Sequence, residues 1–558
     1  MPRYFFLPLF LFFIVESTVS YSTHIRGGYI EVSTDPASLV CQVKLNLYTD
    51  MGSTVQPGGG EMDFGDGSAP VRLNPGNPDE FYQLDNDMAL IIFHESHAFP
   101  GPGTYKISYR ESNRNGGIIN LPNAVNTPFC IETMIVTDPF FGNNSSPHIA
   151  NVFPVWQKSN SDYLYAMLAT DADLDSLSYS PSVPLKDAGH EVDSFYVPAT
   201  VIDDIIQSQM FVTPVTGDII WQNASGEGTY QYAVRIDEWR RQNNNLVKIG
   251  YVIFDFQIYV LETDKILPQI AGIRDTAFVA GTFPEIDFNV SGGNNDSIRL
   301  SLTAGIPLPA QAYTSLPDSI YNSIPVNGII YIKGTDLTRR YYPYKIVLSA
   351  SGTGTDFPRA NHNLYTWFTQ NSSSPLPPTN LRAELLSDNL MRLSWNDPAG
   401  DEAGFIVERS DTYNPGFIRI AALPGNTVSY NDASILGERI YSYRIKAIGT
   451  EFSATSEILE VNSSGIISGM ESQGDLPGII LYPNPAKNFI SVRFRGINPG
   501  LIRINVLDIT GHVRKTSLVR IHDDEDPIEI DIDFLEKGYY IITAAHSGVY
   551  YVARFIKN

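Results

Sequence analysis

Short segments rich in Ser, Pro, Gly and Asn divide the 558-residue chain into blocks, and this division limits the possible folds more than any other feature. They lie at residues 142–147, 371–378 and 462–465, and a less distinct break falls near residues 262–264. Segments of this kind have little to bury and are typical of linkers. The cuts leave four blocks of about 85 to 125 residues ahead of a C-terminal block, and each is the size of a β-sandwich.

The composition favours strands within these blocks. Aromatic residues make up 12% of the chain, with 31 Tyr and 29 Phe, and these residues suit a pleated, half-buried surface. We therefore expect an all-β protein of tandem immunoglobulin-like β-sandwich modules that ends in a C-terminal β-sandwich. The formal net charge of −23 disfavours nucleic acid as a partner, because an acidic surface repels phosphate backbones.

The N-terminus has the pattern of a secretory signal peptide over residues 1–22. Arg3 supplies a positive start, residues 5–15 are an apolar run, and Ser20 and Ser22 offer small residues for cleavage. The alternative is a membrane anchor, but a spanning helix needs about 20 apolar residues, roughly twice this run. The pattern predicts export from the cytoplasm.

The C-terminal block alternates apolar and acidic residues from Ile528 to Phe534, as expected of a strand with one buried face. Four short motifs accompany this pattern, at residues 482–486, 506–511, 535–540 and 554–557. Residues 478–558, preceded by a linker at 463–477, resemble the type A sorting domain of cargo of the type IX secretion system. The residues that carry the match are Pro483, Asn484, Pro485, Asp508, Gly511, Gly538, Tyr540 and Lys557.

This resemblance implies recognition by the type IX secretion machinery and passage across the outer membrane. It also implies removal of the sorting domain, attachment to surface lipopolysaccharide, and a secreted or cell-surface location on the exterior of the outer membrane. The alternative interpretation of the block is a generic small β-sandwich.

Residues 375–462 resemble a fibronectin type III domain. Trp395 takes the place of the core tryptophan, and Tyr441 begins a strand at residues 441–447, where a tyrosine corner is expected. Residues 263–374 alternate like an immunoglobulin-like β-sandwich without a motif of their own.

Residues 23–137 resemble a PKD-type sandwich through the segments 62–68 and 97–107, and residues 23–30 are similar to the start of large surface proteins linked to gliding motility. We expect the Asp66-Gly67 turn to be structural, since Asp caps its own turn and Gly adopts a positive φ. Cys41 and Cys130 both fall in this module. Either they form a disulfide that closes a loop of about 90 residues, or they are two buried free thiols.

Residues 138–262 resemble a cadherin-like repeat through the segments 169–179 and 216–221. Asp171, Asp173 and Asp175 place carboxylates at every second position of a turn, which can direct oxygen ligands at Ca²⁺. The loop is not an EF-hand, because Ser stands where that loop requires Gly and Glu. Asp237 and Glu238 are further ligands if their strand lies beside this loop; the alternative is a solvated acidic turn.

No zinc-protease helix motif, nucleophile elbow or P-loop occurs in the chain, and we expect no enzyme and no cofactor other than the candidate Ca²⁺. The leading hypothesis is a non-enzymatic surface protein for adhesion or gliding-related surface organisation, with other surface proteins or extracellular polysaccharide as partners. The alternative is a glycan-binding protein that captures polysaccharide. Stacking on sugars would then use Trp239, Trp367, Tyr341, Tyr342 and Tyr344, unless these rings belong to the cores.

Overall fold

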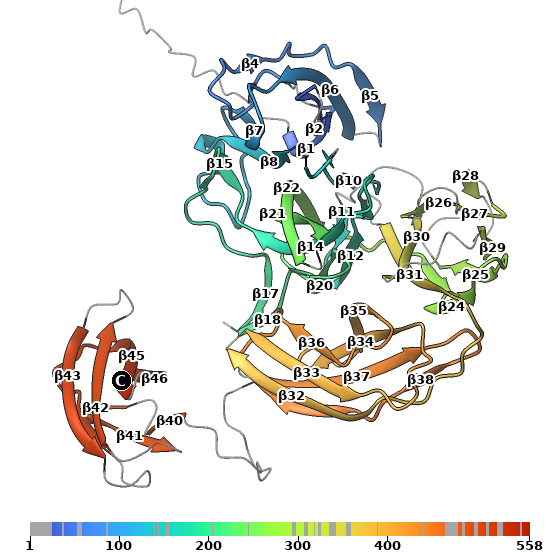
Figure 1. Ribbon diagram of the computed structural model, residues 1–558. Coiled ribbons are helices and arrows are strands. Elements are labelled where there is room, and N and C mark those ends of the chain that lie inside the picture. Colours follow the sequence, from blue (N-terminus) through green and yellow to red (C-terminus); the bar gives the residue numbers. More distant parts are fainter. Residues whose placement is uncertain are drawn as a thin grey trace, which may run out of the picture. The chain divides into compact units, whose positions relative to one another are not determined.

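The computed structural model is built almost entirely of antiparallel strands (Figure 1). It describes residues 25–557 with gaps at 36–37, 53–57, 85–87, 139, 143, 152–155, 204, 244, 293–296, 306–310, 317–318, 322–324, 334–341, 353–358, 388, 438, 464–477, 483–485, 496–499, 509–512, 522–527 and 547–548. The predicted signal peptide lies outside the described residues. No helix in the described part of the chain has the length and hydropathy that a bilayer span requires. The chain divides into two compact units, Met1–Ile466 and Ile467–Asn558.

The first module of the first unit combines three strands of 11 residues with shorter ones. Its elements are β1 Ile25–Asp35, β2 Val40–Asp50, β3 Glu61–Asp63, β4 Val71–Arg72, β5 Glu80–Gln83, β6 Met88–Ala98, β7 Gly103–Glu111, the short 3-10 helix η1 Ala124–Asn126 and β8 Phe129–Thr137. Strand β2 pairs along its whole length with β6 and directs Val43 and Leu45 into the core. The turn before β4 is structural, as predicted: Asp66 Oδ1 accepts the Ser68 N–H at 2.9 Å, and Gly67 has a φ of 84°.

The second module shares a sheet with the first. Its strands are β9 Asn144–Ser145, β10 His148–Ile149, β11 Trp156–Lys158, β12 Ser161–Ala166, β13 Ala169–Thr170, β14 Ser176–Ser182, β15 Leu185–Asp187, β16 His190–Glu191, β17 Ala199–Ile202, β18 Ile205–Gln209, β19 Phe211–Val212, β20 Asp218–Ala224, β21 Gly228–Gln242 and β22 Asn245–Leu261. Strand β22 pairs with β8 at Gly250–Val252 and with β1 at Asp255 and Phe256. The predicted boundary between the two modules is therefore crossed by backbone hydrogen bonds.

The segment predicted to be a linker at residues 142–147 is partly buried. Strand β9 pairs with β1, and Asn144 and Ser146 are 1% and 6% exposed. Their polar groups are satisfied by neighbouring strands; for example, Ser146 Oγ accepts the N–H of Val32 at 2.8 Å. The prediction of a solvated linker is therefore wrong for Asn144 and Ser146, because these small polar residues are buried between neighbouring strands.

The third and fourth modules are two-sheet sandwiches. The third comprises β23 Gln269–Ala271, β24 Thr276–Val279, β25 Glu285–Ser291, β26 Ile298–Ala304, β27 Gln311–Thr314, β28 Ser319–Tyr321, β29 Val326–Lys333, β30 Tyr344–Gly352 and β31 Arg359–Thr369. The fourth comprises β32 Thr379–Ser387, β33 Leu390–Asn396, β34 Gly404–Asp411, β35 Ile418–Pro424, β36 Ser429–Asp432, β37 Ile440–Ile448, β38 Ser453–Thr455 and β39 Leu459–Asn462. As predicted, Trp395 is a core residue that packs on Phe405, and the Tyr441 hydroxyl donates to the carbonyl of Leu436, which makes the tyrosine corner.

Buried contacts also join the later modules of the first unit. Trp367 of β31 shares a core cluster with Ile406 of β34. Lys345 of β30 bonds to Asp218 of β20 at 2.8 Å, and Arg439 donates to the carbonyl of Gln207 at 3.1 Å. The modules are therefore tied together through buried side chains as well as through the chain itself.

The second unit is a small sandwich of two sheets. Its strands are β40 Gly478–Tyr482, β41 Phe489–Arg495, β42 Gly500–Asp508, β43 Val513–Ile521, β44 Ile528–Asp531, β45 Gly538–His546 and β46 Val549–Lys557. Strands β40, β41 and β44 form one sheet, and β43, β42, β45 and β46 form the other. Ile502, Ile504, Ile530 and Phe555 fill the core between them, as the alternation in the sequence predicts.

Candidate functional site

The acidic loop between β13 and β14 brings its three aspartates together. One oxygen from each of Asp171, Asp173 and Asp175 lies within 4.8 Å of the others. Asp171 organises the loop, because its Oδ1 accepts the N–H groups of Asp173 and Asp175, both at 2.9 Å. The prediction that these three carboxylates converge is confirmed, whereas their binding of calcium stays a prediction.

A fourth carboxylate, that of Glu238, reaches the loop from strand β21. Strand β14 follows the loop directly and pairs with β21, so that Leu177 lies opposite Glu238. Glu238 is fully buried, and its Oε2 accepts a hydrogen bond from Asn144 Nδ2 at 3.2 Å. Gly250 opposite leaves room for this side chain, since a Cβ there would lie 2.4 Å from Oε2.

Two buried oxygens of this cluster have no hydrogen-bond partner among the described residues: Asp171 Oδ2 and Glu238 Oε1. Burial, and then repulsion from Asp171, raises the pKa of Glu238 far above that of an ordinary carboxyl. Burial also raises the pKa of Asp171, and the charges of Asp175 and Asp173 add to this effect. Two facing carboxylates need either a shared proton or a cation, and their oxygens are the ligands that Ca²⁺ prefers.

Arg240 compensates part of the negative charge. Its guanidinium holds Asp175 with both Nε and Nη2, the Nε–Oδ1 distance being 3.0 Å, and it lies 3.9 Å from Asp173 Oδ2. It also donates to Asn144 Oδ1 at 2.9 Å. The cluster thus contains one guanidinium and four carboxylates, and a divalent cation would bring it close to neutrality.

Asp237 does not contribute to this cluster. Neighbouring residues of a strand point to opposite faces, and Asp237 is paired with Arg235, at 2.7 Å, and with Lys248. Of the two predicted additional ligands, Asp237 and Glu238, only Glu238 therefore lies on the side of the strand that faces the loop.

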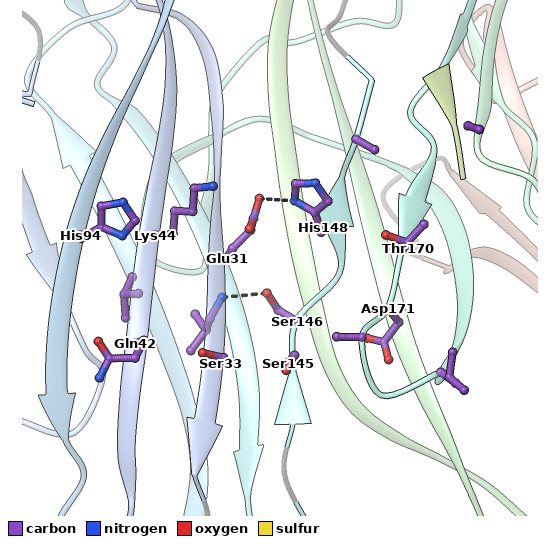
Figure 2. A pocket seen from close by; sticks show the side chains of 16 residues that line it. Glu31, Ser33, Gln42, Lys44, His94, Ser145, Ser146, His148, Thr170 and Asp171 are labelled. Carbon is purple, nitrogen blue, oxygen red and sulfur yellow. Dashed lines mark hydrogen bonds and ion pairs between the residues drawn. The ribbon is translucent and has the colours of Figure 1, made fainter. Parts of the chain in front are cut away.

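A cleft of about 790 Å³ lies beside the acidic loop and is lined mainly by the first two modules (Figure 2). The first module contributes Lys44 and His94 among others, and the second contributes His148 and Asp171. Glu31 and His148 face each other across it, with Glu31 Oε1 at 2.9 Å from His148 Nδ1. The lining combines hydroxyl, amide, carboxylate, amine and imidazole groups with aliphatic side chains such as Val32 and Leu174. None of the described residues that line it is Phe, Tyr or Trp.

The aromatic residues considered for sugar stacking are mostly structural. Trp367 and Tyr344 are 2% and 4% exposed and belong to cores. Trp239 is half-buried and donates from Nε1 to Ser178 Oγ at 2.8 Å, whereas Tyr342 is exposed. Tyr341 lies outside the described residues.

The two cysteines are free and buried, so the expected disulfide is not formed. Cys41 on β2 belongs to the core of the first module, whereas Cys130 on β8 belongs to a separate cluster with Leu185 and Tyr251. Burial raises the pKa of Cys41 to about 11 and that of Cys130 to about 12, so both remain protonated thiols. The alternative of two buried thiols is the one that the structure bears out.

The sorting motifs lie at the ends of strands in the second unit. Tyr540 stacks on Phe555 and donates to the carbonyl of Glu536 at 3.0 Å. Gly538 pairs with Lys557, and Asp508 pairs with Tyr540. The remaining members of the predicted signal, Pro483, Asn484, Pro485 and Gly511, lie outside the described residues.

Comparison with known families decides the nature of this unit. Residues 480–558 match the family described as secretion system C-terminal sorting domain. This segment is a type IX secretion sorting domain. It marks a multi-module protein that is exported through the type IX system to the cell surface or the medium.

The other comparisons are less specific. No curated protein matches the chain. Among solved structures, domains from titin match 57% of this chain and 99% of theirs at 14% identity, with a TM-score of 0.16. A two-domain fibronectin type III segment of chicken tenascin matches 32% of this chain and 97% of its own, at 12% identity and a TM-score of 0.15. The chicken CNTN1 FN1-FN3 domains match 53% of this chain and 99% of theirs, at 14% identity and a TM-score of 0.18.

Proposed function

We propose that the first unit is a non-enzymatic scaffold for adhesion, displayed on the cell surface after export and linked there to lipopolysaccharide. The observation that carries the proposal is the way its modules are joined: strand β22 pairs with two strands of the first module, and buried side chains connect the later ones. Joints of this kind keep their geometry under load better than flexible linkers do. Gliding-related surface organisation is the other role that such a scaffold would serve.

Calcium would complete the joint between the first two modules. The converging oxygens of Asp171, Asp173 and Asp175 fit a hard divalent cation. Glu238 lies beside Asp171, and each of these two residues has one buried oxygen without a partner among the described residues. Asp171, Asp173, Asp175 and Glu238 would hold it. Because Ser145 on β9 donates its N–H to Asp173 and also pairs with β1, the ion would stiffen the segment that connects the modules.

The cleft beside the acidic loop is the surface on which the ligand of this scaffold would bind. Its hydrogen-bonding groups suit a hydroxyl-rich or charged partner, such as extracellular polysaccharide or another surface protein. The same lining favours capture of polysaccharide as the second candidate function, through hydrogen bonds and not through aromatic stacking.

The test combines cell adhesion with a glycan array. A deletion strain is expected to lose adhesion or gliding, and the wild-type chain to restore it. Lys44→Met in the cleft is expected to fail to restore it, whereas the matched Lys106→Met on β7, outside the cleft, restores it. Normal adhesion and gliding of the deletion strain would refute the proposal.

Selective binding of residues 23–466 to one polysaccharide on the array, lost in Lys44→Met, would favour the second candidate. Hydrolysis of a tested polymer that persists through purification would contradict the non-enzymatic proposal.

A further inference from the structure

Three buried side chains meet where the second module contacts the third. Lys345 Nζ and Asn363 Nδ2 both donate to the same oxygen, Asp218 Oδ1, at 2.8 and 3.0 Å. Lys345, Asn363 and Asp218 are 8%, 1% and 2% exposed. An amine and an amide thus share one carboxylate oxygen in a site that is nearly free of solvent.

The strand register fixes this arrangement. Strands β30 and β31 are antiparallel, with Lys345 opposite Tyr365 and Val347 opposite Asn363. Lys345 and Asn363 are therefore diagonal neighbours on one face, a spacing that a long side chain can bridge. Asp218 reaches the pair from β20, and its second oxygen accepts a hydrogen bond from the hydroxyl of Tyr365.

Burial makes the charged form of Lys345 less favourable than it is in water. Burial lowers the pKa of Lys345, and the positive charge of Arg419 lowers it further, whereas Asp218 opposes the shift. A desolvated lysine amine is a nucleophile, and a buried lysine–carboxylate pair can become neutral by passing one proton from nitrogen to oxygen.

The asparagine is presented as the electrophile. Asn363 Oδ1 is buried and has no hydrogen-bond partner among the described residues. Because the O and N of an amide are interchangeable by a flip, Asp218 can face either atom, and a protonated carboxyl can donate to the carbonyl oxygen. The shared bond to Asp218 Oδ1 keeps the amine and the amide close together, and such proximity raises the rate of a reaction between them.

We propose that Lys345 and Asn363 are joined by an intramolecular isopeptide bond that forms with Asp218 as proton carrier. The ammonium of Lys345 gives a proton to Asp218, and the lone pair of Nζ attacks Cγ of Asn363. The Nζ–Cγ bond forms, the Cγ–Nδ2 bond breaks, and Nδ2 leaves as ammonia with a second proton from Nζ that Asp218 relays. The reaction exchanges one amide for another and needs no oxidant, reductant or co-reactant.

The bond would give the scaffold a covalent crosslink between β30 and β31. Because Asp218 belongs to the second module, the crosslink would form only after the second and third modules have docked. The presence of the crosslink would therefore indicate that the second and third modules have assembled correctly.

Mass spectrometry of the full chain tests the proposal directly. Digestion with trypsin is expected to leave residues 341–359 uncut at Lys345 and joined to residues 360–382, with a mass lower than that of the two peptides by one molecule of ammonia. Asn363→Ala, which keeps the Lys345–Asp218 ion pair, and Asp218→Asn are expected to yield the separate peptides and cleavage at Lys345.

The matched control is Asn361→Ala, on the same strand and face, which is expected to keep the crosslink. Separate wild-type peptides with cleavage at Lys345, from protein shown by circular dichroism to be folded, would overturn the proposal. A crosslink between Lys345 and Asp218 with loss of water would also overturn it, because Asn363 would not be the acceptor.

Discussion

Two buried acids on the same hairpin, β21–β22, differ in their partners: one is paired with an arginine, and the other lies next to a second carboxylate. Asp255 accepts two hydrogen bonds from the fully buried Arg114, at 3.2 and 2.9 Å, and another from Gln231 at 2.5 Å. Glu238, farther along the hairpin, faces the carboxylate of Asp171 and receives one hydrogen bond from Asn144. Burial raises the pKa of both acids, but Arg114 opposes the shift only at Asp255.

The contact of Asp255 with Arg114 is balanced in charge and is called the finished contact below. The contact of Glu238 with Asp171 is not balanced and is called the incomplete contact. At Asp255 each negative oxygen is matched, so the network needs nothing further and holds the first two modules together. At Glu238 the negative charge exceeds the positive charge, and the missing positive charge is what a cation would supply.

The largest expected effect comes from breaking the finished contact. Arg114→Met would leave Asp255 buried without its cation, which should reduce the free energy of unfolding by about 3–5 kcal/mol. Urea unfolding of residues 23–466 measures it, with Arg110→Met as an exposed control that changes little. Equal losses of unfolding free energy in the two variants would show that the Arg114–Asp255 contact stabilises the protein no more than an exposed arginine does.

Calcium should have the next largest effect, and only at the incomplete contact. At a calcium concentration of 100 times Kd, the first unit should gain about 2.7 kcal/mol in the free energy of unfolding. The gain should be absent in Asp171→Asn and present in Arg114→Met. Thermal unfolding with calcium and with a chelator measures it, and the same gain in Asp171→Asn would argue against the site.

Replacing the carboxyl of Glu238 should stabilise the calcium-free protein. Burial and the charge of Asp171 raise the pKa of Glu238 to about 9, so this carboxyl must take up a proton when the chain folds at pH 7 without calcium. Glu238→Gln needs no such proton, which should raise the free energy of unfolding by about 1 kcal/mol in chelator and abolish the calcium gain. Asp237→Asn on the other face is the control: it loses two ion pairs and keeps the calcium gain. Destabilisation by Glu238→Gln in chelator would mean that the buried pair is satisfied without a cation.

The smallest expected effect on stability comes from Asp66, a paired acid in a turn. Hydrogen bonds from Ser68 and His97 lower the pKa of Asp66 to about 2. Because the folded pKa lies below the unfolded value of about 3.9, this pairing stabilises the protein above pH 4 and is lost as pH falls towards 2.

Asp66→Asn should therefore cost about 1 kcal/mol or less at pH 7 and flatten the dependence of stability on pH between about 4 and 2. Chemical unfolding over this pH range measures it. If the free energy of unfolding depends on pH equally in the wild type and the variant, the pairing of Asp66 does not stabilise the protein.

Local patterns predicted much of the fold. Alternation located the strands, and the core roles of Trp395 and Tyr441 followed from a resemblance that the packing confirms. The convergence of Asp171 with its neighbours was also predictable, because it depends on one turn.

The rest depends on contacts between distant segments. Glu238 joins the loop only through the register of β14 on β21, which the sequence does not display. Arg114 lies in a polar stretch that reads as a loop, and its burial follows from Asp255, 141 residues away. The sequence around Asn144 likewise predicts a linker, because its burial depends on Glu238, 94 residues away.

Calorimetric titration of calcium into residues 23–466 tests the central claim most directly, since β22 depends on both modules and the second module alone would lack β1 and β8. The account predicts a saturable heat for one site per chain, lost in Asp171→Asn and in Glu238→Gln and kept in Asp237→Asn. No heat at millimolar calcium with folded wild-type protein would contradict it.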